Sequence, residues 1–201
     1  MKPRDVVTYF DKNYMNPTEF KNIWLKNDFE TWAEFPTEQI ENSTLNNSTK
    51  EFLKVGFPDS AAPFLNFGLI SYDNEFTNIY DYYSDNELET NTKNYWIIGS
   101  DNSGNLICVD TSQNDKIIIV DHEQEFEIIE TMNQNISELS KSLLLFRNFI
   151  EDVNSEFSED GFFDSMYSLK HIQKLEEEFT SNRIVSSFWD TEIENLKANI
   201  E

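Results

Sequence analysis

The sequence contains a single cysteine, Cys108, among its 201 residues. A lone thiol cannot form a disulfide within the chain, and it cannot supply the several thiolates of a cysteine-based zinc site. The sequence also lacks any run close to the roughly 18–20 apolar residues that a membrane-crossing helix needs. The opening residues, MKPRD, do not have the apolar segment of a signal peptide. We therefore expect a cytoplasmic protein without a membrane span.

Glycine and proline are also scarce, with five of each. No Gly/Ser-rich or proline-rich linker and no internal repeat divides the chain, and its length suits one domain. Bulky apolar side chains occur throughout, with 17 Phe, 8 Tyr and 4 Trp, which indicates a packed core. We predict a single domain over residues 1–201, with a core at about 35–155 and a C-terminal helical extension at about 160–201.

Basic residues are few: 15 Lys and Arg face 38 Asp and Glu, which gives a net charge of −23 and a pI near 4.2. Phosphate backbones and anionic lipids repel such a chain, so we expect no direct contact with nucleic acid or membranes. Residues 72–130 alone carry 14 acids and two bases. A basic protein partner would complement this charge and associate faster because of it. The alternative is that the acids serve solubility alone.

Helix signals dominate the first sixty residues. Asn16 and Pro17 offer an N-cap followed by proline at the first helical position. Ser48 and Glu51 predict a capping box for a helix over residues 48–55, and Gly56 stands where a left-handed C-terminal cap is needed. These signals predict short helices before the sheet.

Short apolar runs then predict a sheet. The runs at residues 95–98, 106–109 and 117–120 are separated by short, turn-rich connectors, so neighbouring strands should run antiparallel. The run at 117–120 is apolar at every position, which is typical of a strand covered on both faces. Phe126 and Ile128 alternate with glutamates, which predicts a strand with one solvated face.

The remaining chain is predicted to be helical. Asn135 and Glu138 form a capping box before an apolar stripe of Ile136, Leu139, Leu143, Phe146, Ile150 and Val153. Two more helices are expected from about residue 165, with inner faces formed by Leu169, Ile172, Leu175, Phe188, Trp189, Ile193 and Leu196. The order of elements predicts an α+β fold, in which a central, mostly antiparallel twisted sheet is flanked by N-terminal and C-terminal helices.

The sequence has few residues suited to catalysis. His122 is placed at a strand end and His171 on a helix, and neither has the sequence context of a catalytic base. Cys108 lies within a predicted strand, where an inert buried thiol is expected. No GxGxxG pattern, Walker motif or nucleophile elbow occurs. We predict no catalytic site and no cofactor.

Two acidic features could indicate a metal site or an acid–base pair instead. Residues 101–105 resemble part of a calcium loop, but the later bidentate glutamate is missing, so a turn is the favoured interpretation and no metal site is predicted. Asp110 and Asp121 could serve as general acid and base if the fold brought them together. An enzymatic function would require such a convergence.

Acidic and aromatic residues together suggest a protein-binding surface. The run at residues 79–89 interleaves tyrosines with acids, and tyrosines anchor interfaces at low entropic cost. The first candidate contacts are Tyr80, Asp81, Tyr82, Tyr83, Asp85, Glu87 and Glu89. The second are the strand-end acids Asp101, Asp110, Asp121 and Glu123. The alternative for the tyrosine run is a strand followed by a solvated loop.

Several segments, taken in order, resemble the SUKH superfamily, which includes bacterial Syd and a yeast cell-wall assembly regulator. They are residues 50–58 (KEFLKVGFP), 62–67 (APFLNF), 96–101 (WIIGSD), 104–110 (GNLICVD), 116–123 (KIIIVDHE), 132–139 (MNQNISEL) and the pair Phe188 and Trp189. The chain departs from the family at Phe57, where a second glycine is common, and in a polar insertion before residue 48.

The resemblance implies a non-catalytic immunity protein that binds and neutralises a cognate bacterial polymorphic toxin. Many such toxins are nucleases, whose basic surfaces match the acidic composition of this chain. The alternative within the same resemblance is a housekeeping or regulatory interaction module whose partner is not a toxin. No oligomeric state is predicted from the sequence.

Overall fold

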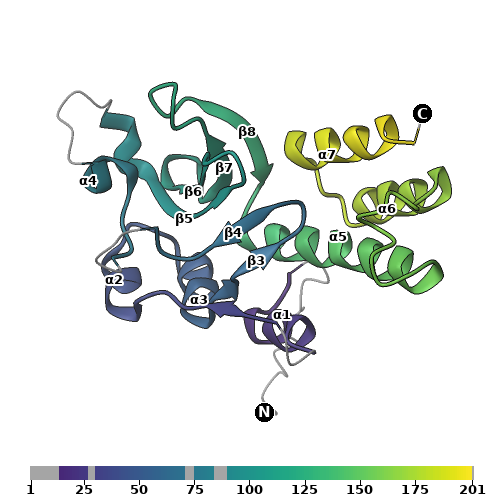
Figure 1. Cartoon of the computed structure of the whole chain (residues 1–201). Coiled ribbons are helices and arrows are strands. Elements are labelled where there is room, and N and C mark those ends of the chain that lie inside the picture. The colour runs from purple at the N-terminus through teal and green to yellow at the C-terminus, as the bar shows by residue number, and fades with distance from the viewer. Residues whose placement is uncertain (1–13, 27–29, 71–74, 84–89, 201) are drawn as a thin grey trace, which may run out of the picture.

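A six-stranded antiparallel sheet lies at the centre of the fold (Figure 1). The structure is a computed structural model, and it describes residues 14–26, 30–70, 75–83 and 90–200. The strands follow one another in chain order across the sheet: β3 (Ser60–Ala61), β4 (Leu65–Phe67), β5 (Tyr95–Asp101), β6 (Leu106–Asp110), β7 (Lys116–Val120) and β8 (Ile128–Asn133). A separate two-stranded sheet pairs β1 (Trp32–Ala33) with β2 (Phe57–Pro58).

Helices precede and follow this sheet, which confirms the predicted α+β class. The first group is α1 (Pro17–Trp24), α2 (Thr37–Asn42) and α3 (Asn47–Val55); α4 (Ile79–Tyr83) lies between β4 and β5; and the last group is α5 (Ile136–Glu156), α6 (Leu169–Ser181) and α7 (Ser187–Ala198). Two short 3-10 helices, η1 (Thr90–Asn94) and η2 (Thr111–Gln113), flank β5 and β6. Within the described residues, none of the helices is long and apolar enough to cross a membrane.

The strands β6 and β7 are buried on both faces. Ile107, Val109, Ile117 and Ile119 point into the main core, which also contains buried side chains of α3, α5, α6 and α7. Leu106, Cys108, Ile118 and Val120 point into a smaller core on the other face, together with Ile79 of α4 and Phe126. Double coverage explains why these strands are apolar at successive positions. It confirms the prediction for residues 117–120.

Most predicted helix ends are confirmed. The Asn16 side chain accepts hydrogen bonds from the backbone N–H groups of Thr18 and Glu19, with Pro17 as the first helical residue. Gly56 ends α3 with a φ of +93°, where a Cβ would lie 2.3 Å from the carbonyl oxygen of Ala33. Glycine is therefore required at this turn both by its backbone conformation and by the close approach of β1.

The predicted capping box at Ser48 and Glu51 is wrong. The helix begins one residue earlier, and Asn46 is the cap: its Oδ1 accepts from the backbone N–H of Thr49 at 2.9 Å. The Ser48 hydroxyl donates to the same Asn46 oxygen at 2.7 Å. Two plausible capping residues lie two positions apart, and asparagine takes the role because its own oxygen reaches the N3 amide.

The N-terminus of α5 departs from its prediction in one bond. Asn135 Oδ1 accepts from the backbone N–H of Glu138 at 2.9 Å, as expected. The Glu138 carboxylate accepts from the N–H of Gln134 at 2.6 Å, one residue before the cap. The acid therefore satisfies an amide outside the helix, and it ties the end of β8 to the start of α5.

Three local predictions need correction. Glu125 and Phe126 have left-handed φ values of 51° and 62° and belong to the turn between β7 and β8, so the last strand begins only at Ile128. The tyrosine run at residues 79–83 forms the helix α4, not a strand. Leu169 is 56% exposed at the first position of α6, one turn before the buried Ile172.

We expect Gly99→Ala to destabilise the sheet. An added Cβ at Gly99 would lie 2.1 Å from the carbonyl oxygen of Asn66 on the paired strand β4, so the two strands must move apart. Overpacking of this kind should lower the free energy of unfolding by about 2–3 kcal/mol, measured by urea denaturation. Ser100→Ala, one residue further along β5, is the control and should change little. Equal stability of the two variants would contradict this packing.

Candidate protein-binding surface

The antiparallel register brings two acidic turns to one end of the sheet. Leu106 pairs with Ser100 on one side and with Val120 on the other, so the β5–β6 and β7–β8 turns leave the sheet together. The His122 imidazole lies 3.4 Å from the Asn105 amide oxygen and links the two turns. Asp101, Asp121 and Glu123 are therefore close together, as part of one surface.

Asp101 holds its own turn in shape. Its carboxylate accepts from the backbone N–H groups of Ser103 and Asn105 at 2.8 and 2.9 Å, and from the Asn105 amide at 3.0 Å. The carboxylate oxygens that could bind a calcium ion therefore accept hydrogen bonds from the N–H groups of this turn instead. In the part of the chain that the structure describes, no three His, Cys, Asp or Glu side chains are grouped to hold a metal ion.

Asp121 plays the same role in the β7–β8 turn. Its carboxylate accepts from the Glu123 N–H and from the Gln124 side-chain amide, both at 2.8 Å. The hydrogen bond from the Glu123 N–H lowers the pKa of Asp121, and the bonds from Gln124 and the nearby His122 act in the same direction. The carboxylate remains charged throughout the neutral range. With the exposed Glu123, Glu125 and Glu127, the turn projects a concentrated negative charge.

Asp110 does not belong to this surface, and its assignment as a partner contact is wrong. The residue is 0% exposed. Its carboxylate caps η2 by accepting from the Ser112 N–H at 2.9 Å, the Ser112 hydroxyl at 2.6 Å and the Gln113 amide at 2.9 Å. It pairs with Lys116, at the opposite end of β7 from Asp121. At about 3.4 Å per residue the two acids are roughly 17 Å apart, so they do not form an acid–base pair.

The tyrosine run lies beside the β7–β8 turn. Ile79 anchors α4 in the smaller core, and the ring of Tyr83 packs on that of Phe126 with centroids 4.7 Å apart. Tyr82 donates to the Ile70 carbonyl oxygen at 3.4 Å, and the Tyr80 ring lies 4.1 Å from the Lys93 ammonium. Asp81 accepts from the Asn78 side-chain amide at 2.7 Å. Asp85, Glu87 and Glu89 lie outside the described residues.

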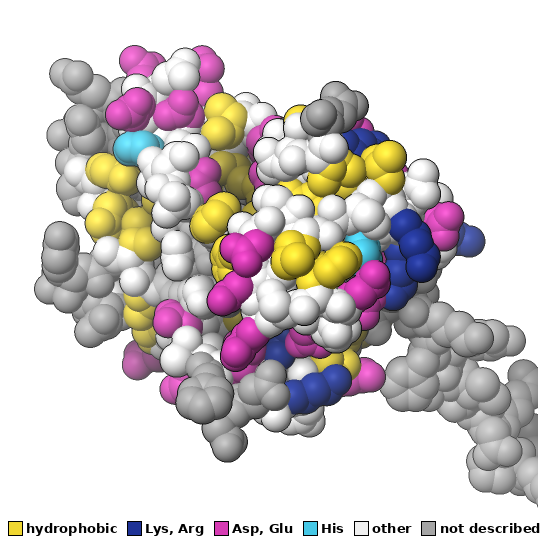
Figure 2. All heavy atoms as spheres, turned by 45° about the vertical axis from the view of Figure 1, so that its right-hand side comes forward, with side chains coloured by type: hydrophobic (Ala, Val, Ile, Leu, Met, Phe, Trp, Pro, Cys, Tyr) yellow, Lys and Arg dark blue, Asp and Glu magenta, His cyan; other side chains and the backbone are white. Residues whose placement is uncertain are grey.

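The contact between Tyr83 and Phe126 joins the two predicted sets of binding residues. The combined surface, which we call the acidic turn face, consists of Asp101, Asp121, Glu123, Glu125, Glu127 and Tyr83. Acidic side chains gather around one of the two histidines at the upper left of Figure 2. Basic side chains collect on the other side of that view, near the second histidine. An exposed tyrosine beside clustered carboxylates suits a basic protein surface.

A second surface was missed by the sequence analysis. The β3–β4 hairpin, α5 and the segment after it enclose a groove of about 580 Å³. Trp24, Arg147 and Ile150 line it, and Phe64 and Phe163 project beside it; we call it the aromatic groove. In the sequence, Phe64 lies in a turn-rich segment and Phe163 in an acidic one. Nothing in the sequence places these two residues at the same groove, because only the fold brings them together.

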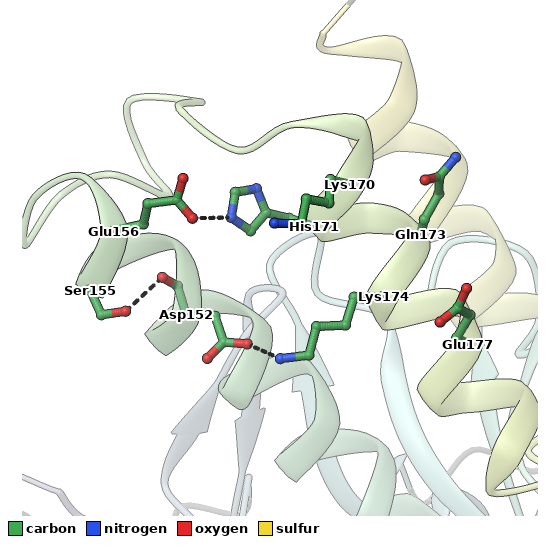
Figure 3. Close-up of a pocket in the computed structure, with 8 residues that line it drawn as sticks. All are labelled: Asp152, Ser155, Glu156, Lys170, His171, Gln173, Lys174 and Glu177. Carbon is green, nitrogen blue, oxygen red and sulfur yellow. Dashed lines mark hydrogen bonds and ion pairs between the residues drawn. The ribbon is translucent and has the colours of Figure 1, made fainter.

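A third hollow, of about 460 Å³, lies between α5 and α6 and is polar (Figure 3). Four of its side chains form two pairs: His171 Nε2 lies 3.1 Å from the Glu156 carboxylate, and Lys174 forms an ion pair with Asp152. The other imidazole nitrogen of His171 accepts from the Ser168 N–H at 3.1 Å and so caps α6. These contacts assign His171 a structural role.

Cys108 should be inert in the folded protein. It is buried in the smaller core, where burial, and secondarily the charge of Asp110, raises the pKa of the thiol well above its usual value. We expect negligible labelling by a thiol reagent at pH 8 in native buffer and stoichiometric labelling in denaturing urea, followed by mass spectrometry. Rapid labelling of the native chain would contradict the burial of β6.

No protein-family model, no curated protein and no solved structure matches this chain. The resemblance to the SUKH superfamily therefore stays a prediction from the sequence.

Proposed function

We propose that this chain is a non-catalytic, cytoplasmic immunity protein of the SUKH type, which binds and neutralises a basic, nuclease-type bacterial toxin through the acidic turn face. The observation that carries the proposal is the meeting of the two acidic turns at one end of the sheet, where the Tyr83 ring at the end of α4 packs on Phe126 of the β7–β8 turn. The whole chain is also strongly negative, with a net charge of −23.

The physical basis is electrostatic. A nuclease must carry basic groups to hold phosphates, and an acidic protein attracts that same surface. Charges act over a Debye length of about 8–10 Å at ordinary salt, so several carboxylates clustered on two turns act together on an approaching partner. Asp101 and Asp121 are fixed by bonds from their own turns, so these carboxylates are already ordered before binding.

The proposal predicts salt-sensitive capture of a neighbour. Tagged protein should be tested against the polypeptides encoded beside its gene, at low and high salt. We expect capture of a basic chain, with association slowed about tenfold at low salt by Glu123→Lys and Glu127→Lys together, because both side chains are exposed on the β7–β8 turn.

The matched control reverses two acids near the other end of the sheet. Glu34 and Glu38 are exposed beside Phe35, whose ring packs on Phe76 near the start of β5. Glu34→Lys and Glu38→Lys change the net charge by the same amount and should slow association much less. Equal effects of the two pairs would rule out the acidic turn face while keeping the partner. Failure to capture any neighbour would instead favour the interaction module with a non-toxin partner.

A further inference from the structure

We infer that the aromatic groove binds a peptide segment of a protein partner that carries arginine or lysine next to a bulky apolar side chain. This inference extends the proposed function, because it assigns the anchoring contact to a second site beside the acidic turn face. The groove is large enough for such a side chain and its neighbours, at about 580 Å³.

Two of the aromatic side chains that line the groove are unusually exposed. Phe163 is 71% and Phe64 is 67% exposed, although most phenylalanines in the described residues are buried. Phe163 is held in place by its neighbour Phe162, whose ring packs on Phe149 and stacks on Tyr167 with centroids 5.9 and 5.7 Å away. The chain therefore presents Phe163 to solvent from a firmly packed base. Rigid, exposed aromatics are typical anchors of protein interfaces.

The backbone at Phe64 points to the same role. Phe64 has a φ of 57°, in the left-handed region that bulky residues rarely occupy. Folding does not require phenylalanine at this position, because its side chain contributes little to the core and a glycine would fit the turn better. A residue that is both strained and exposed at a groove indicates a binding role.

The charges around the groove select a basic occupant. Arg147 lies inside it, but its guanidinium is held by Glu30 at 3.1 Å, by Glu151 at 2.8 Å and by the Trp24 carbonyl oxygen at 2.6 Å. Two carboxylates on one guanidinium leave the cluster negative. Among the residues that line the groove, Glu30 and Glu151 are the two acids and Arg147 is the one base. A basic side chain can then lie against Phe64 or Phe163 by cation–π attraction.

The groove also continues into the acidic turn face. Asn102 lines the groove and belongs to the same turn as Asp101, whose carboxylate shapes that turn. A partner drawn to the acidic turns would thus meet the groove along the same side of the molecule. Acids would set the rate of encounter, and the aromatic contacts would set the lifetime of the complex.

The test is an NMR titration of the intact, ¹⁵N-labelled chain with three capped tripeptides: Arg-Phe-Arg, Arg-Gly-Arg and Glu-Phe-Glu. We expect Arg-Phe-Arg to shift the signals of residues 61–66 and 162–163 and the Arg147 side-chain N–H. Arg-Gly-Arg should bind about tenfold more weakly, and Glu-Phe-Glu should not bind there. Shifts confined to the acidic turn face, or none at the groove, would overturn the inference.

Variants separate binding from folding. Phe64→Gly should weaken Arg-Phe-Arg binding about tenfold, without lowering the midpoint of urea unfolding, because glycine relieves the left-handed φ. Val185→Gly, which removes an apolar side chain that is 73% exposed before α7, should leave binding unchanged. Unchanged affinity of Phe64→Gly would sink the inference, as would concentration-dependent shifts at the groove without peptide, which would identify a second copy as the occupant.

The titration tests the groove and the neighbour capture tests the immunity function, so either hypothesis can be rejected without the other. Groove shifts with Arg-Phe-Arg but no captured neighbour would keep this inference and reject the immunity function. Capture of a basic neighbour with no groove shifts would keep the immunity function and reject the anchoring site.

Discussion

The inner strands β6 and β7 are apolar on both faces, and both faces must therefore be covered. Helices α3 and α5 belong to the core on one face, while α4 and Phe126 complete the smaller core on the other. Because α4 covers part of the second face, its last residue, Tyr83, packs on Phe126 of the β7–β8 turn. The position of the proposed binding residues is thus a consequence of how the sheet is buried.

The same pairing determines which acids can meet a partner. Antiparallel register sends Asp101 and Asp121 to one end of the sheet and Asp110 to the other. All three carboxylates bind backbone N–H groups in their own turns, so each is structural as well as charged. The β7–β8 turn adds the exposed Glu123, Glu125 and Glu127, and the β5–β6 turn borders the aromatic groove through Asn102. Asn102 thus links the proposed acidic turn face to the proposed anchoring site.

Much of the fold could be predicted because its signals are local. Asn16 with Pro17, Gly56, and the apolar runs of β5, β6 and β7 each depend on residues close in the sequence. The binding surfaces could not be predicted in the same way. Asp101 and Asp110 are followed by similar turn-forming residues, yet only Asp110 is covered by the fold. The meeting of Tyr83 with Phe126, and of Phe64 with Phe163 at one groove, requires contacts between distant segments.

Hydrogen–deuterium exchange of the chain, alone and in complex with the basic polypeptide encoded beside it, would show directly which surface the partner covers. We expect slower exchange on binding in α4, in the β5–β6 and β7–β8 turns and in the β3–β4 hairpin, with α6 and α7 unchanged. Protection confined to α6 and α7 would contradict the proposed surface, and unchanged exchange throughout the chain would contradict the complex itself.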